Sequence, residues 1–108
     1  MRLNDICKLA YKTAKSKGWW DEPTRTDLEI LALIHTEVSE TVEACRNSDS
    51  LIFYNEKGEP SGVLIELADI IIRVADWCGH EGWDIEEAIK IKMEWNKTRS
   101  YRHGGKLK

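Results

Sequence analysis

Segment 63–78 is the part of the sequence that most limits how this chain folds. Its apolar residues surround almost the whole circumference of a helix, and a helix of that kind belongs in a core. Its charged residues, Glu66, Asp69, Arg73 and Asp76, nevertheless fall in one stripe about 80° wide. An unpaired buried carboxylate costs several kcal/mol, so this stripe needs partners inside the protein.

Two helices are expected before this segment. The first runs from about residue 4 to 17 and stops at Gly18. The second begins at Thr26, whose spacing from Glu29 matches a capping box, and reaches about residue 46. Both have helical spacing of apolar residues, which favours packing against the 63–78 helix.

The rest of the chain completes an expected helical bundle. The 63–78 helix is predicted to stop at Gly79, and a fourth helix is predicted from a cap at Asp84 to about residue 98 or 99. The 47–61 connection has a short apolar run and a turn, which indicates a small hairpin or an ordered flap. We predict an all-α fold of the four-helix bundle type.

The size of the chain predicts association. Its 108 residues are expected to form one domain, 1–108, with 100–108 as a basic tail. Such a domain buries only about 60–70 % of its unfolded surface. We therefore expect the chain to associate with further copies of itself, which would supply the missing core.

Charge and hydropathy argue against several classes of protein. A formal net charge of -3 is not typical of a protein built to hold duplex nucleic acid. The sequence predicts no signal peptide, and charged residues interrupt every apolar run that could cross a membrane. Cys7, Cys45 and Cys78 lack the spacing of a zinc site or a disulfide framework and are expected to be reduced core residues. The expected location is the cytoplasm.

The second expected helix contains an acidic pair. Glu37 projects into its apolar arc, and Glu40 lies about 60° further round. Glu43 points the opposite way and is expected to face solvent. A spacing of three residues places Glu37 and Glu40 close enough to share one ion.

The charged stripe of the 63–78 helix has the same spacing in Glu66 and Asp69. If both acidic pairs face each other, positive charge must lie between them. One hypothesis is a buried salt-bridge network that uses Arg73. The other is a hard divalent cation, Mg²⁺ or Mn²⁺, held by four carboxylates between the helices.

Donor residues continue along the fourth expected helix and into the tail. Lys92, Asn96 and Arg99 lie on the same side as its apolar face, and His103 and Lys106 follow. This arrangement is typical of an anion-binding surface. A lysine beside apolar residues also often extends outward to solvent, which is the alternative for Lys92.

Adjacent tryptophans follow the first expected helix. Trp19 and Trp20 offer flat surfaces on which a nucleobase could stack, and packing in the core or at an interface is the alternative. Trp77, Trp83 and Trp95 are expected to be packing residues.

With these residues the chain resembles the MazG-like family of all-α nucleoside triphosphate pyrophosphohydrolases over nearly its whole length. The family's metal signature is Glu-x-x-Glu on one helix and Glu-x-x-Asp on the next. Here these motifs are Glu37-Val38-Ser39-Glu40 and Glu66-Leu67-Ala68-Asp69. The segments KGWWD, ELADIIIRVAD and KMEWNKTRSYRHGGK also resemble small single-domain members.

The resemblance implies Mg²⁺-dependent hydrolysis of (deoxy)nucleoside triphosphates between the α and β phosphates, which releases a nucleoside monophosphate and pyrophosphate. The metal ligands it implies are Glu37, Glu40, Glu66 and Asp69. One glutamate of the first pair, Glu40, is the candidate for orienting water instead. The phosphate or sugar contacts it implies are Lys92 and Asn96, with Arg99, His103 and Lys106 as further candidates. It also implies dimers or tetramers with active sites near subunit contacts.

Two other classes remain for comparison. A ferritin-like di-iron oxidoreductase needs Glu-x-x-His pairs, and His35, His80 and His103 do not follow that spacing. A non-catalytic helical module that binds nucleotide or another protein would use the same ligands without turnover.

Overall fold

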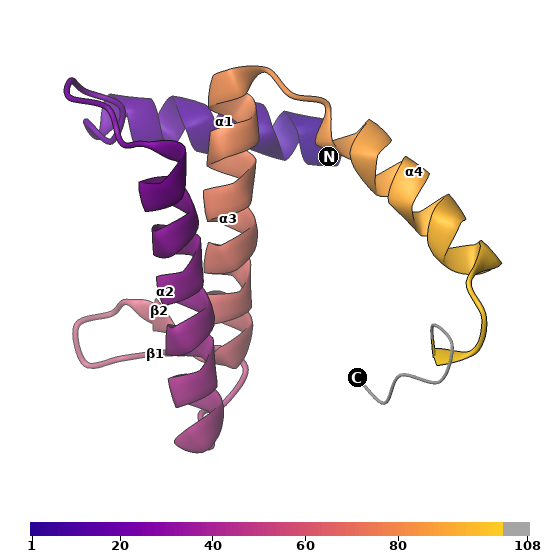
Figure 1. The fold of residues 1–108 in the computed structure, drawn as a ribbon. Helices are drawn as coiled ribbons and strands as arrows, with labels where there is room; N and C mark the ends of the chain where they lie inside the picture. The colour runs from indigo at the N-terminus through magenta and orange to yellow at the C-terminus, as the bar shows by residue number, and fades with distance from the viewer. Residues whose placement is uncertain (103–108) are drawn as a thin grey trace.

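The computed structural model describes residues 1–102, in which helices dominate (Figure 1). The helices are α1 (Leu3–Ser16), α2 (Asp27–Arg46), α3 (Val63–Glu81) and α4 (Ile85–Thr98). Two short strands, β1 (Phe53–Tyr54) and β2 (Pro60–Ser61), form an antiparallel hairpin between α2 and α3. The prediction of an all-α protein is confirmed, with the hairpin in the connection where a hairpin or flap was expected.

The helices begin and end mostly where the sequence predicts. The Thr26 hydroxyl accepts a hydrogen bond from the Glu29 backbone N–H at 3.2 Å, and the Glu29 carboxylate accepts one from the Thr26 backbone N–H at 2.9 Å. This is the predicted capping box. Asp84 accepts a hydrogen bond from the backbone N–H of Glu87 at 3.1 Å and caps α4. Gly18, with φ +86°, follows the end of α1.

The predicted end of α3 at Gly79 is wrong. The helix continues to Glu81, and Gly82 ends it in the left-handed conformation at φ +72°. Gly79 instead lies against α1, where an added Cβ would be 2.8 Å from the Cβ of Tyr11 and closer still to the Cys7 carbonyl oxygen. Its role is to let the two helices approach closely.

Three of the helices pack together. α2 and α3 run antiparallel and side by side, and α1 crosses α3 near its C-terminal end (Figure 1). The small core between α1 and α3 consists of Cys7, Ala75 and Cys78. Cys45 is exposed on α2, so the expectation that all three cysteines are core residues is wrong for this one.

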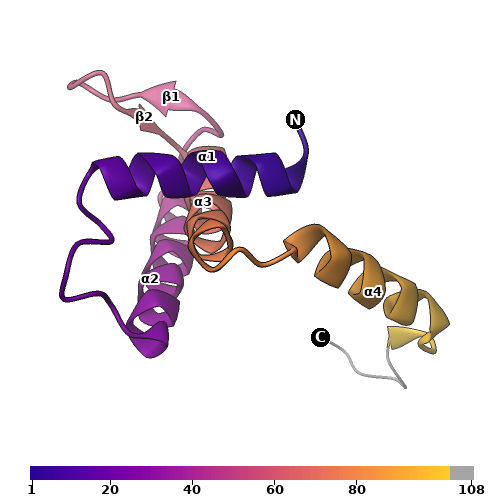
Figure 2. The same cartoon turned by 90° about the horizontal axis from the view of Figure 1, so that it is seen from above.

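The fourth helix projects away from the other three (Figure 2). Its first residues are attached to α1: the Asn4 side chain donates to Asp84 at 2.9 Å, and the Asn4 backbone N–H donates to Glu86 at 2.7 Å. Beyond this attachment α4 is exposed along its length. Within one chain the four helices therefore do not close into the predicted bundle.

Among residues 1–102, no helix combines the length and the apolar character that crossing a membrane requires.

Candidate metal centre and substrate groove

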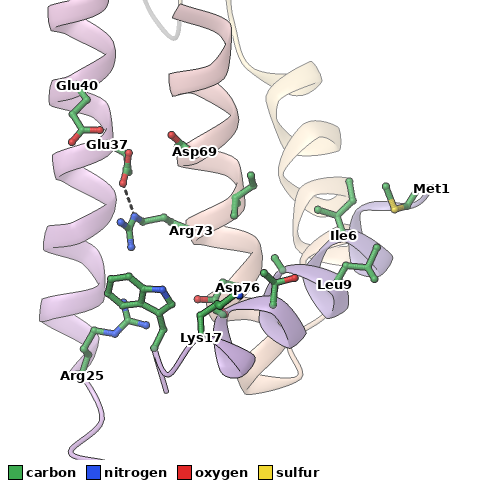
Figure 3. A pocket seen from close by; sticks show the side chains of 15 residues that line it. Met1, Ile6, Leu9, Lys17, Arg25, Glu37, Glu40, Asp69, Arg73 and Asp76 are labelled. Carbon is green, nitrogen blue, oxygen red and sulfur yellow. Dashed lines mark hydrogen bonds and ion pairs between the residues drawn. The ribbon is translucent and has the colours of Figure 1, made fainter. Parts of the chain in front are cut away.

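Carboxylates from two antiparallel helices meet at one point. One oxygen each from Glu37 and Glu40 of α2 and from Glu66 of α3 lie within 4.8 Å of one another. Three of the four predicted metal ligands are thus brought together. Asp69 is outside this group of three, but it lies one turn further along α3 and lines the same groove as Glu37 and Glu40 (Figure 3). Glu43 is exposed, as predicted.

The carboxylates raise each other's affinity for protons. The hydrogen bond and the negative charge of Glu37 raise the pKa of Glu40. Burial, followed by the charges of Asp69 and Glu37, raises the pKa of Glu66. Burial and the charge of Glu37 also raise the pKa of Asp69. Negative charge at this point is therefore incompletely compensated by the protein itself.

Arg73 supplies the nearest compensating charge. Its Nε lies 2.7 Å from Oε1 of Glu37, which is only 7 % exposed. The arginine reaches from α3 to α2 rather than back along its own helix toward Asp69 (Figure 3). The salt-bridge hypothesis is therefore right about Arg73, but one guanidinium pairs with only one of the clustered carboxylates.

The remaining oxygens suit a hard divalent cation. Oε2 of Glu66 is buried and has no hydrogen-bond partner among the described residues. All the ligand atoms on offer are carboxylate oxygens, which Mg²⁺ and Mn²⁺ prefer over nitrogen or sulfur. The orphaned oxygen and the raised pKa values both fit residues that would hold such an ion.

A groove of about 610 Å³ extends from the acidic cluster. Its volume is within the range of about 300–1,000 Å³ that is common for small-molecule sites. Apolar side chains of α1, such as Ile6 and Leu9, line one end, and Glu37 and Asp69 line the other. The groove thus joins an apolar surface to a highly charged one.

Aromatic and cationic side chains lie together beside the groove. Trp19 is 54 % exposed and lines it. The guanidinium of Arg25 lies 5.6 Å from the Trp19 ring centroid, and that of Arg73 lies 5.9 Å away. The exposed Trp19 ring is consistent with the predicted stacking surface, and the two arginines add positive charge next to it.

Trp20 has a different environment from Trp19. Its ring stacks on His80, with centroids 3.7 Å apart and planes at 6°, and its Nε1 donates to Asp76 at 2.8 Å. The Arg25 guanidinium lies 5.0 Å from the same ring. These contacts favour the packing alternative for Trp20.

The predicted donors of the last helix lie away from the cluster. Lys92, Asn96 and Arg99 are exposed on or just after α4, and none of them lines the groove of their own chain. His103 and Lys106 lie outside the described residues. Trp95, predicted to pack, is 60 % exposed on α4.

Several residues that line the groove were not predicted as site residues, among them Asp76 and Arg25. Asp76 belongs to the charged stripe on α3, and its helical spacing after Asp69 and Arg73 could have placed it on the same side of the helix as the site. Arg25 precedes a helix cap and gave no such signal, because only the folded chain places it over the tryptophans. No protein-family model, curated protein or solved structure matches the chain significantly.

We expect the metal-free protein to lose stability as the pH rises above about 4, the ordinary carboxyl pKa. The pKa values of Glu40, Glu66 and Asp69 are raised in the folded state, so the folded chain binds more protons than the unfolded chain between the ordinary and the raised values. The free energy of unfolding therefore falls as pH rises through that window. Two capping carboxylates with lowered pKa values, Glu29 and Asp84, act in the opposite direction, below about pH 4.

Urea unfolding in EDTA at pH 5, 6.5 and 8, repeated with Mg²⁺, measures this effect. Mg²⁺ should stabilise the protein most at pH 8, where the carboxylates are charged. Glu43→Gln should keep the wild-type profile because Glu43 faces solvent. A metal-free protein that becomes steadily more stable from pH 5 to 8 would contradict the role given to the acidic cluster.

Proposed function

We propose that this chain is a MazG-like nucleoside triphosphate pyrophosphohydrolase that uses Mg²⁺ or Mn²⁺. The observation that supports this most directly is the meeting of Glu37, Glu40 and Glu66 at the charged end of a groove lined by Trp19 and two arginines. Carboxylates for a metal beside cations for phosphate are the components of metal-assisted phosphoryl transfer.

Each group in the groove has a role in this proposal. Glu37 and Glu66 would hold the metal, with Asp69 placed to hold it or one of its waters. The metal, when bound, neutralises phosphate oxygens and lowers the pKa of bound water. Glu40, the exposed member of the cluster, accepts a proton from the attacking water.

The remaining residues orient the nucleotide. Arg25 lies over the tryptophans, where it can bind phosphate or cover the base, and the exposed face of Trp19 stacks on the base. Water oxygen attacks the α phosphorus, and the bond from that phosphorus to the α,β-bridging oxygen breaks. The products are a nucleoside monophosphate and pyrophosphate.

Product analysis tests the proposal. The purified protein is incubated with canonical and modified (deoxy)nucleoside triphosphates and Mg²⁺ in ¹⁸O-labelled water. We expect monophosphate and pyrophosphate, with the label in the monophosphate, and no reaction in EDTA. Orthophosphate together with a nucleoside diphosphate would contradict cleavage between the α and β phosphates.

The second candidate function is binding of nucleotide without cleavage. The same groove and acidic cluster would serve it, because ligands alone do not establish turnover. A nucleotide that raises the melting temperature in Mg²⁺ but yields no product from the whole panel would favour this non-catalytic module.

Association of two or more copies is part of the proposal. The chain exposes 8544 Å², whereas a compact monomer of its mass exposes about 6,200 Å². The difference between these two areas is larger than the area that residues 103–108 could expose. It is also larger than the area that each partner buries in a standard dimer, about 800 Å². Val38, Val42 and Leu67 line an apolar groove of about 440 Å³ between α2 and α3, on which a second copy would pack.

The projecting α4 gives this association a functional consequence. Lys92 and Asn96 do not line the groove of their own chain. They contact substrate only if α4 of one copy lies over the groove of another, and this is the arrangement we propose. Exposed apolar residues on the same face of α4, Ile89 and Met93, would be buried in the same contact.

Mixing two inactive variants tests this composite site. Glu66→Gln and Lys92→Ala should each lower activity strongly when assayed alone. In a dimer mixed by co-refolding, half of the molecules are mixed pairs with one intact site each, so activity should return to about one quarter of wild type. No recovery would place both residues in the site of one chain, and full activity of Lys92→Ala alone would remove Lys92 from the site.

A further inference from the structure

Arg73 lies at the charged end of the groove, between Glu37 of the acidic cluster and Trp19. On one side its Nε donates to Glu37 at 2.7 Å. On the other side its guanidinium lies 5.9 Å from the Trp19 ring centroid, and 32 % of its side chain is exposed. Among the described residues, its terminal nitrogens make no hydrogen bond, so most of its donors are available to another ligand.

The ion pair between Arg73 and Glu37 is incompatible with a metal ion bound to Glu37. Glu37 contributes an oxygen to the cluster in which Glu66 has an orphaned oxygen. A divalent ion bound to Glu37 at about 2.1 Å would lie within roughly 5 Å of the guanidinium, and the two positive charges would repel each other. The Arg73–Glu37 ion pair and a bound metal therefore compete.

We propose that Arg73 is a displaceable counter-ion. It neutralises Glu37 while no metal is bound, and it turns into the groove and binds a substrate phosphate when the carboxylates take up the metal. This inference rests on the proposed function and adds a consequence to it: metal and nucleotide bind cooperatively. The metal alone must break the ion pair, whereas a nucleotide gives the released guanidinium a new partner.

Metal affinity measured without turnover tests this proposal. Mn²⁺ is titrated by electron paramagnetic resonance, with and without an α,β-methylene triphosphate analogue that cannot be cleaved. The ratio of the two dissociation constants is the coupling factor. The variants are Arg73→Gln and, as a control that also removes one positive charge, Lys12→Gln at an exposed position on α1.

We expect Arg73→Gln to bind Mn²⁺ alone about tenfold more tightly than wild type, because a charged hydrogen bond no longer has to break. Its coupling factor should fall by about tenfold, since the nucleotide no longer gains a guanidinium. Lys12→Gln should keep the wild-type coupling factor. Equal coupling factors for Arg73→Gln and wild type would overturn the proposal. A wild-type protein that binds no Mn²⁺ would instead contradict the proposed metal site, so the two failures are distinguishable.

A measurement on the wild-type protein covers the case in which Arg73→Gln does not fold. The arginine Nε–H signals are recorded by ¹⁵N nuclear magnetic resonance, and the Arg73 signal is assigned by its absence in Arg73→Lys. The signal should be protected from solvent exchange in EDTA, lose protection in Mg²⁺, and regain it when the analogue is added. Protection that Mg²⁺ leaves unchanged would show that Arg73 stays on Glu37 and would also overturn the proposal.

Discussion

Glu66→Gln should abolish turnover while leaving the chain folded. We expect activity to fall by about 10³-fold, which is the scale expected for losing a charged metal ligand. Without metal, the variant should be more stable than wild type at pH 8 by about 1 kcal/mol, since two charges about 4 Å apart repel by that much even in water. Product assays and urea unfolding in EDTA measure the two effects.

The opposite signs of these effects make the prediction specific. Glu66 has a buried oxygen that no residue of the described part, 1–102, hydrogen-bonds, and its pKa is raised, so neutralising it removes a cost from the metal-free fold. Glu43→Gln is the matched control, because Glu43 is exposed on α2 and should change neither quantity. If Glu66→Gln unfolds, the carboxylate belongs to a structural network. If it keeps activity, Glu66 is not a metal ligand.

Gly79→Ala should destabilise the protein by about 3 kcal/mol, the upper end of the usual cost of overpacking. Helix propensity alone predicts the reverse, a gain of about 0.5–1 kcal/mol for alanine in a helix interior. The structure decides the sign, because the new methyl group would overlap the Cys7 carbonyl oxygen and the Cβ of Tyr11. Helices α1 and α3 would have to separate, and they enclose the small core.

Chemical unfolding of Gly79→Ala beside Gly82→Ala tests this prediction. The second variant adds the same methyl group three residues later, where the described residues leave open space around it, but at φ +72°. It should cost about 1 kcal/mol from backbone strain alone. Equal losses for the two variants, or a gain for Gly79→Ala, would show that contact with α1 does not limit position 79.

The starts of α2 and α4 were predictable because contacts between residues close in sequence decide them. Thr26 and Glu29 form their capping box through atoms three residues apart, and Asp84 caps α4 in the same way. The end of α3 was not predictable. A glycine is compatible with both a helix end and a close helix contact, and at Gly79 only the presence of α1 distinguishes them.

The candidate site was predictable in part for a related reason. Spacing along one helix places Glu37 beside Glu40, whatever lies opposite. Spacing does not tell which member of the second pair faces them, and the antiparallel packing of α2 on α3 brings Glu66 into the cluster while Asp69 stays one turn away. The direction of α4 also depends on a nonlocal contact, the hydrogen bonds of Asn4 with Asp84 and Glu86.

The sequence by itself determined where the helices lie along the chain, the caps at Thr26 and Asp84, and the presence of a carboxylate at position 37 within an apolar arc, because these depend on neighbours within about one turn. The tertiary structure decided what that carboxylate meets. Arg73 is 36 residues away along the chain and reaches Glu37 only because α2 and α3 lie side by side. Distances between side chains on different helices depend on how the helices pack. Only the folded chain therefore shows that Arg73 is the partner of Glu37 and that Lys92 and Asn96 do not line the groove of their own chain.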